Sequence, residues 1–430
     1  MSKRLTVLLC LLTASNIVKA DVVASQACQV PHGFKEVVQD FFKVNLKMRA
    51  VVSYLRSTIA EEGIGWLKEF GLNVSSTRDL NKVGGDFGTP YLNLELKAGI
   101  HTFFDINSSR AKTRASRYSS GDPSVVEAEK LTSEYIEIII NLNLKRGLLS
   151  VTEAYLAAKR NDLKEGEIRE RYNDISISEK AEFKSSASDA EHSYIKLKND
   201  INTLEESYKL YYPSFKKNGT TLVVPDLSIE DLEKMVCLDD DASKFTSLAL
   251  EKAAHALDEA RAKLMGNISR YIPYIKFSSK TYIGKRSNRE IGEKDLASIE
   301  VVWDLSPYRF METYQAHAMY EYTKFNFSWE EMKYGSEFAK YFGEVKVTKS
   351  SYEGAKLAME AKRIALEDAV SQYRTGAITH TKVGNVRTEY YNSVERYYSN
   401  AEKYTKALLE YLKFIGKIRN IFVEQLDKEI

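Results

Sequence analysis

Cysteine, histidine and proline are scarce in this chain of 430 residues, which contains three, six and seven of them respectively. So few cysteines exclude a small fold that is held together by disulfides. No histidine stands at metal-ligand spacing from another histidine or from a cysteine. The phosphate-binding loop, the nucleophile elbow and the dinucleotide fingerprint are absent as well. The sequence therefore predicts no catalytic, cofactor-binding or metal-binding residues, and the rare prolines leave room for long helices.

A strong charge of either sign is also missing, because the formal net charge is +2. That balance gives no electrostatic case for nucleic acid as a partner. The chain lacks an apolar run long enough to cross a bilayer as a helix. The closest candidate, 136–149, is interrupted by Glu137, Lys145 and Arg146 among others. A membrane-embedded part would therefore have to consist of β-strands.

Residues 1–20 have the pattern of a secretory signal peptide. Lys3 and Arg4 precede a short apolar run, and Val18-Lys19-Ala20 gives a small-residue cleavage site before Asp21. The alternative is a buried N-terminal helix. If 1–20 is removed, residues 21–430 form the mature chain.

The mature chain keeps Cys28 and Cys237. In an oxidising compartment these two cysteines could form a disulfide. Two unrelated buried thiols are the alternative, and the sequence leaves both open. The acidic run Asp239-Asp240-Asp241 fits a solvated loop better than a cation site.

One pattern occurs twice. In each copy an alternating segment ends at an aromatic–Asp pair, and a helical pattern then runs to a turn at a tyrosine. The first copy runs from Phe104-Asp105 to Tyr172, and the second from Trp303-Asp304 to Tyr373. Roughly 70 helical residues at about 1.5 Å each would span roughly 100 Å. Such a repeat favours a protein that bridges two places over a compact enzyme.

Two β-hairpins are expected, one ahead of each long helix. The clearest strands alternate apolar and polar residues: Leu92, Asn93, Leu94, Glu95, Leu96 and Lys97, then Ile299, Glu300, Val301, Val302, Trp303 and Asp304. Strands of about 9–12 residues suit a tilted membrane strand. A closed barrel needs about eight strands or more, so several copies would share one, and three copies would supply about twelve. The alternative is a soluble sheet covered by helices.

The mature chain, 21–430, is expected to form one unit. Its expected order is a helix at 33–62, a first hairpin at 66–104, long helices at 105–211, an irregular equatorial insert at 212–241, a helix at 242–268, a second hairpin at 271–305, long helices at 306–416 and a tail at 417–430. Ser119–Pro123 is expected to interrupt the first long helix.

Three segments resemble the TolC family of outer-membrane channels, and the resemblance covers nearly all of the mature chain. Ala365–Gly416 resembles the family's C-terminal helix pair with its Tyr373-Arg374-Thr375-Gly376 turn. Leu94–Asp105 resembles its strand that leads into a long helix. Ile272-Pro273-Tyr274-Ile275 resembles the start of its third strand.

The resemblance implies a mainly α fold with a small membrane β part. It implies a homotrimer whose 12-stranded β-barrel in the outer membrane continues into a periplasmic α-helical barrel. The implied partners are a periplasmic adaptor protein and an inner-membrane transporter. The implied role is passive export by a tripartite efflux pump or a type I secretion system.

The resemblance also implies candidate site residues. Tyr373, Gly376, Lys382 and Asn385 would form a periplasmic gate, with lysine and asparagine at positions where several members carry carboxylates. A ring of lysines would attract anions, unless Lys382 points outward. The barrel lumen would be lined by polar strand residues: Asn93, Glu95, Lys97, Glu300 and Asp304. The first turn, at Tyr172, lacks the expected glycine.

The leading hypothesis is thus a non-enzymatic outer-membrane export channel. The alternative is a periplasmic coiled-coil scaffold or adaptor that does not insert into a membrane. A soluble enzyme with a helical shell is a more distant alternative.

Overall fold

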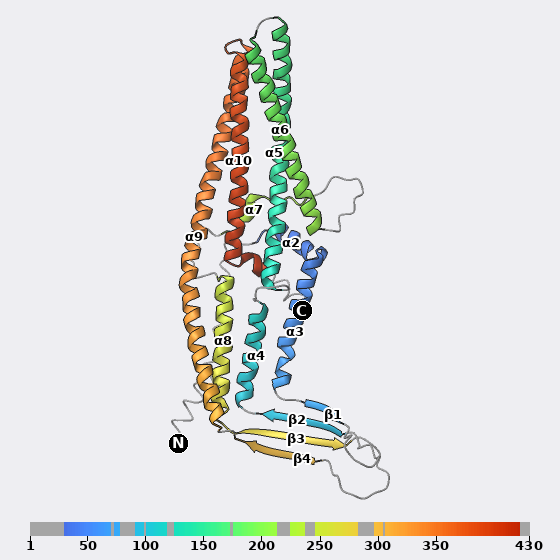
Figure 1. Ribbon diagram of the computed structural model, residues 1–430, viewed down its shortest axis with the longest axis vertical. Coiled ribbons are helices and arrows are strands. Elements are labelled where there is room, and N and C mark those ends of the chain that lie inside the picture. The colour runs from blue at the N-terminus through green and yellow to red at the C-terminus, as the bar shows by residue number, and fades with distance from the viewer. Residues whose placement is uncertain are drawn as a thin grey trace.

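The computed structural model describes residues 30–69, 73–77, 91–98, 100–117, 124–172, 175–212, 224–236, 246–282, 296–303 and 306–421. They form an elongated helical bundle with a small sheet at one end and two helix turns at the other (Figure 1). We call these the sheet end and the tip.

The helices are α2 (His32–Val44), α3 (Leu46–Glu69), α4 (Ile100–Arg117), α5 (Val125–Arg171), α6 (Ile177–Tyr211), α7 (Ile229–Met235), α8 (Leu248–Ser269), α9 (Pro307–Arg374) and α10 (His380–Phe414). The strands are β1 (Asn73–Thr77), β2 (Tyr91–Ala98), β3 (Tyr274–Tyr282) and β4 (Leu296–Val302). The 68 residues of α9 correspond to about 100 Å of helix.

The elements form three successive layers with the same kind of order. The sheet is antiparallel in the order β1-β2-β3-β4. Near the sheet, the main helix contacts run α3–α4–α8–α9, and near the tip they run α6–α5–α10–α9. The first element in each order (β1, α3 or α6) comes from the first half of the chain, and the last element (β4 or α9) comes from the second half.

The helix expected at 33–62 is divided at Asn45, and its second part extends to Glu69. Asn45 has an extended backbone. Its side chain accepts a hydrogen bond from the Met48 amide at 2.9 Å, as a helix N-cap does, and donates to the Tyr211 carbonyl at 2.8 Å. These two hydrogen bonds favour a break where helical periodicity alone predicts continuity.

The first long helix is in fact two helices, because α4 ends before the expected interruption and α5 begins after it. Helix α4 also begins at Ile100, so Phe104 and Asp105 lie inside it and not at its junction with the strand. Asp105 forms an ion pair with Arg270 at 3.1 Å, and Trp303 donates to the Tyr271 carbonyl at 2.9 Å. Both copies of the aromatic–Asp pattern therefore contact the same corner, between α8 and β3.

Two further boundaries differ from expectation. The helix expected at 242–268 is α8, which begins at Leu248 after the Ser247 cap. The insert expected to be irregular contains α7, which begins with a capping box formed by Ser228 and Asp231.

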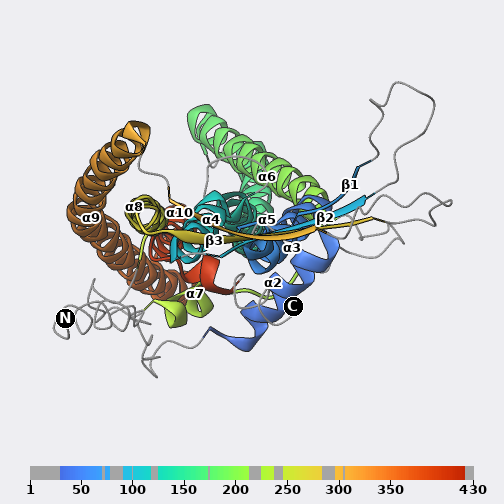
Figure 2. The same cartoon turned by 90° about the horizontal axis from the view of Figure 1, so that it is seen from below.

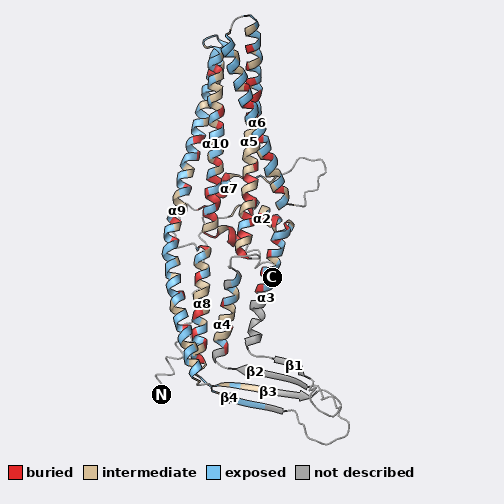
Figure 3. Cartoon of the chain, in the orientation of Figure 1, coloured by how far each residue is buried: buried red, intermediate tan, exposed pale blue. Residues whose placement is uncertain are grey.

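The buried core lies at the middle of the long axis, where the halves of the bundle meet (Figure 3). Phe41, Tyr135 and Tyr208 stack there, with ring centroids 4.3 Å apart for the first pair and 5.8 Å for the second. The sheet-end half of α9, by contrast, is largely exposed. The chain thus has its densest packing at its waist.

The turn at the tip end of α9 depends on Gly376, whose φ is +75°. Its amide donates to the Tyr373 carbonyl at 2.9 Å, and the Ala377 amide donates to the Gln372 carbonyl at 2.9 Å. This is a Schellman motif, in which glycine takes the left-handed position without steric cost.

A charged cluster is buried beside the core. Arg419, which is 2% exposed, forms an ion pair with Glu251 at 2.9 Å and donates to the Thr246 carbonyl at 3.0 Å. Nearby Glu129 is also 2% exposed, and its Oε1 has no hydrogen-bond partner. Burial raises the pKa of Glu129 to about 7, although the charges of Arg419 and Lys413 oppose the shift.

This raised pKa predicts a pH-dependent stability. The folded chain holds the Glu129 proton more tightly than the unfolded chain does. The protonated carboxyl therefore stabilises the folded state fully below about pH 4.5, and this stabilisation is lost as the pH rises through about 7. Glu129→Gln is expected to stabilise the protein at pH 8 by up to about 3 kcal/mol. Thermal unfolding followed by circular dichroism at pH 5 to 8 measures this. Glu153→Gln, an exposed change on the same helix, is the control. An unchanged pH profile in Glu129→Gln would contradict the assignment.

Candidate functional site

The sheet has one polar and one apolar face. Directly paired residues share a face, and the register aligns Lys97 with Lys276 and Lys276 with Glu300. Glu95 and Asn93 lie on the same face, opposite Ser278 and Lys280. Four of the predicted lumen positions, Asn93, Glu95, Lys97 and Glu300, are therefore brought to one face. The fifth, Asp304, lies outside the described residues.

The other face of the sheet is apolar. Leu96 pairs with Phe277, which pairs with Ile299, and Ala98 pairs with Ile275, which pairs with Val301. Ile299 and Val301 are 73% and 72% exposed. An exposed apolar face on a sheet marks a surface that is normally covered by lipid or protein.

Helix α10 has two covered sides and one open side. Tyr397 stacks on Tyr352 of α9, and Arg387 forms an ion pair with Asp162 of α5. Tyr404, two turns from Tyr397 on the same side, also stacks on Tyr352 and donates to Glu233 of α7 at 2.6 Å. The open side carries exposed residues at spacings of three and four: Lys382, Asn385, Glu389, Asn392, Arg396, Ser399 and Lys403. We call this row the open face of α10.

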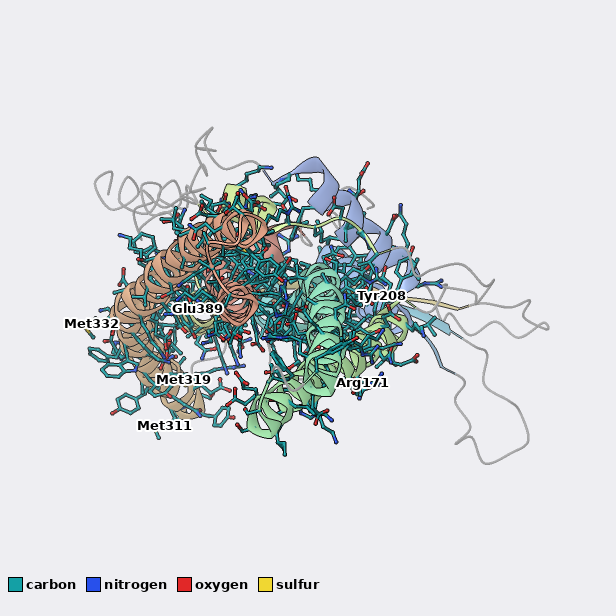
Figure 4. All side chains as sticks on the ribbon, turned by 90° about the horizontal axis from the view of Figure 1, so that it is seen from above. Arg171, Tyr208, Met311, Met319, Met332 and Glu389 are labelled. Atoms are coloured by element: carbon teal, nitrogen blue, oxygen red, sulfur yellow. The ribbon has the colours of Figure 1, made fainter. Side chains whose placement is uncertain are left out.

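Helix α7 lies on one side of the bundle, away from the side towards which the edge helices curve. Seen from the sheet end, α9 and α6 curve towards one side, and α7 lies on the other (Figure 2). The view from the tip agrees (Figure 4). The chain is therefore curved in cross-section, with α7 on the convex side.

The two tip hairpins, α5–α6 and α9–α10, are joined by a charged clasp. Asp162, whose side chain is 6% exposed, lies 3.2 Å from Arg387 and 3.3 Å from His380 Nε2. His380 is also 3.3 Å from Glu165, and its ring contacts Tyr373 edge-on at 5.7 Å. The clasp thus connects the α9–α10 turn to α5.

The predicted gate residues gather at one tip. Tyr373 and Gly376 form the turn after α9, and Lys382 and Asn385 are exposed in the first turns of α10. The clasp is not predicted from the sequence, because Asp162 and Arg387 are far apart along the chain. The continuation of the open face to Lys403 was not predicted either, although the spacing of three and four residues could have revealed it.

Some predicted features lie outside the described residues. These are the signal peptide at 1–20, Cys28, Cys237 and Asp239-Asp240-Asp241. Within the described ranges, no helix is long and apolar enough to cross a membrane. In the same part of the chain, no three acidic, histidine or cysteine side chains are placed to hold a metal ion.

By sequence, the chain matches no protein-family profile. No curated protein matches it either.

Solved structures do match. The Campylobacter jejuni CmeC outer membrane channel has a TM-score of 0.63 at 12% identity, over 93% of this chain and 90% of that one. The outer-membrane channel OprN has a TM-score of 0.65 at 12% identity, over 92% and 95%. The Neisseria gonorrhoeae MtrE outer membrane channel in its open state has a TM-score of 0.58 at 12% identity, over 89% and 88%.

These matches cover nearly the whole length of both chains at very low sequence identity. The shared part of the fold therefore includes both the long helices and the sheet. The resemblance to TolC-family outer-membrane channels is therefore confirmed at the level of the fold.

Proposed function

We propose that this chain is one protomer of a passive outer-membrane export channel without enzymatic activity. Three copies would form a homotrimer whose sheets close a 12-stranded β-barrel in the outer membrane and whose helices form a tube across the periplasm. The observation that carries the proposal is the sheet, which has an exposed apolar face, a polar face and two edge strands, β1 and β4. In lipid, such edges require strand partners.

The curvature of the chain supports a tube. If the concave side faces the axis, α7 lies outside (Figure 2). The open face of α10, which is exposed, is then the side of that helix proposed to line the lumen. Lys382 and Asn385 then face the pore near the tip, and the clasp at Asp162 holds the turn that carries them. The fold shared with CmeC and MtrE, both outer membrane channels, supports the same location.

The proposed partners are a periplasmic adaptor protein and an inner-membrane transporter, which would supply the energy that a passive channel lacks. The tip is the proposed adaptor site. Tyr172 and Ile177, at the α5–α6 end, are 80% and 82% exposed. Exposed apolar side chains on a polar surface suit a protein contact. Both an efflux pump and a type I secretion system fit this arrangement.

Membrane fractionation tests the location. The proposal expects the protein in the outer-membrane fraction, where it resists extraction by high salt and carbonate and is released by detergent. The competing function is a periplasmic coiled-coil scaffold or adaptor, which the long helices alone would also suit. Recovery of the protein with the soluble periplasm at low salt would overturn the channel and favour the scaffold.

Planar-bilayer recording tests the gate. Lys382→Asp replaces a positive ring by a negative one, so the channel is expected to shift from anion towards cation preference, with a several-fold change in permeability ratio. Lys234→Asp is the matched control, because Lys234 is an exposed lysine on α7, on the convex side. Equal selectivity in Lys382→Asp and the unmodified protein would show that Lys382 does not face the pore.

A further inference from the structure

We propose that α6 of one copy packs along the tip half of α9 of the next copy, with Asn199 opposite Gly354 and His192 opposite Ala361. The inference rests on the proposed ring of copies and adds the residues that join them.

A row of exposed residues on α9 has no covering element among the described parts of the chain. Val347, Leu357 and Ile364 are 67%, 73% and 55% exposed. Gly354, Ala361 and Asp368 continue the row at spacings of three and four, and all three are exposed. The buried residues Val345 and Tyr352 face α10 from the other side of α9. This periodicity is that of a coiled-coil seam.

Helix α6 carries a matching exposed row at the other edge of the layer. Ile195 and Leu210 are 50% and 77% exposed. Lys184, His192 and Asn199 belong to the same row and are exposed as well. Its buried residues, including Ala187, Ala190 and Leu197, belong to the opposite side of the helix.

Ion pairs that cross the layer fix the relative height of the two rows. Glu191 of α6 pairs with Arg160 of α5 at 3.0 Å. Two residues along α5, Asp162 pairs with Arg387 of α10 at 3.2 Å.

Two residues along α10, Glu389 pairs with Lys362 of α9 at 2.6 Å. Glu191 and Lys362 therefore lie at about the same height along the long axis. Copies related by rotation about an axis parallel to the helices keep this height.

At this height the two rows are complementary. His192 and Asn199 face the small residues Ala361 and Gly354, which leave room for a close approach of the helices. Lys184 comes level with Asp368, so opposite charges meet. Inside the described part of the chain, Asp368 accepts a hydrogen bond from Gln372 at 2.8 Å.

The order of the elements in each layer indicates that a second copy of the chain covers the exposed row on α9. Near the tip the order ends at α6 and α9, and in the sheet it ends at β1 and β4. A single contact between copies therefore brings α6 next to α9 near the tip and β1 next to β4 in the sheet. The exposed face of α9 also continues towards the sheet through Tyr322, Phe325 and Trp329, and Figure 4 labels Met311 and Met332 on the same helix.

Such a contact joins two different surfaces, and contacts of this kind form a ring when the rotation between copies closes. A second copy of the chain carries both kinds of edge, and a different protein would have to match each of them separately.

Disulfide trapping tests the register. In full-length protein with Cys10, Cys28 and Cys237 replaced by serine, Asn199→Cys with Gly354→Cys is expected to yield covalent oligomers on a non-reducing gel, reversed by reductant. Asn199→Cys with Ala361→Cys is the control for height, because seven helical residues are about 10 Å, beyond the reach of a disulfide. Asn199→Cys with Lys356→Cys is the control for the side of α9, because Lys356 is close to Gly354 in height but lies on a different side of the helix.

The outcomes separate the two proposals. A native oligomer in which a control pair cross-links better than Asn199–Gly354 overturns the register and leaves the channel intact. Absence of any oligomer on a native gel overturns the ring itself.

A charge exchange gives a second readout that does not depend on the cysteines. Lys184→Asp is expected to lower the temperature at which the oligomer dissociates, and adding Asp368→Lys is expected to restore it. No restoration would contradict the contact.

Discussion

Unsatisfied edges are the constraint on which the rest of this structure depends. A strand at the end of a sheet presents backbone donors and acceptors that need partners, and in lipid no water can supply them. Here β1 and β4 are the ends of the sheet, and exposed rows on α6 and α9 end the helical layer at the tip. The same two halves of the chain supply the ends of every layer. A single copy is thus most densely packed at its waist, and among the described residues its layers end in strands and helix faces that no other element covers.

The waist explains how such an incomplete chain folds. Phe41, Tyr135 and Tyr208 stack where α2, α5 and α6 meet, and the Arg419–Glu251 pair closes the C-terminal end onto α8. Packing is densest there and sparse towards both ends (Figure 3). At the tip, the charged contacts around Asp162 join the hairpins, and the Tyr155–Tyr391 stack adds an aromatic contact between the same two helices, α5 and α10. Such a sparse set of contacts is easier to rearrange than the dense core at the waist, which would suit the gate proposed at the tip.

The repeat also shows how similar patterns acquire different roles. In the second half α9 runs unbroken from the sheet to the tip, whereas in the first half the same distance is covered by α4 and α5. The aromatic–Asp pairs converge on one corner, where Asp105 binds Arg270 and Trp303 binds Tyr271. Only the second turn has the glycine of a Schellman motif, and the α5–α6 turn instead leads into a capping box at Ser176. The two tips therefore present different surfaces to a partner.

Sequence by itself determined the helical character, the alternation that gives the sheet two unlike faces, and the glycine turn at Gly376, because these depend on local periodicity and backbone preference. It did not predict the break at Asn45, since the Tyr211 carbonyl that binds this side chain comes from another helix. Nor did it predict the clasp between Asp162 and Arg387 or the side of α10 on which Lys382 lies. Those depend on which helices become neighbours, and only the tertiary structure decided that, because contacts between residues distant in the chain leave no periodic pattern in the sequence.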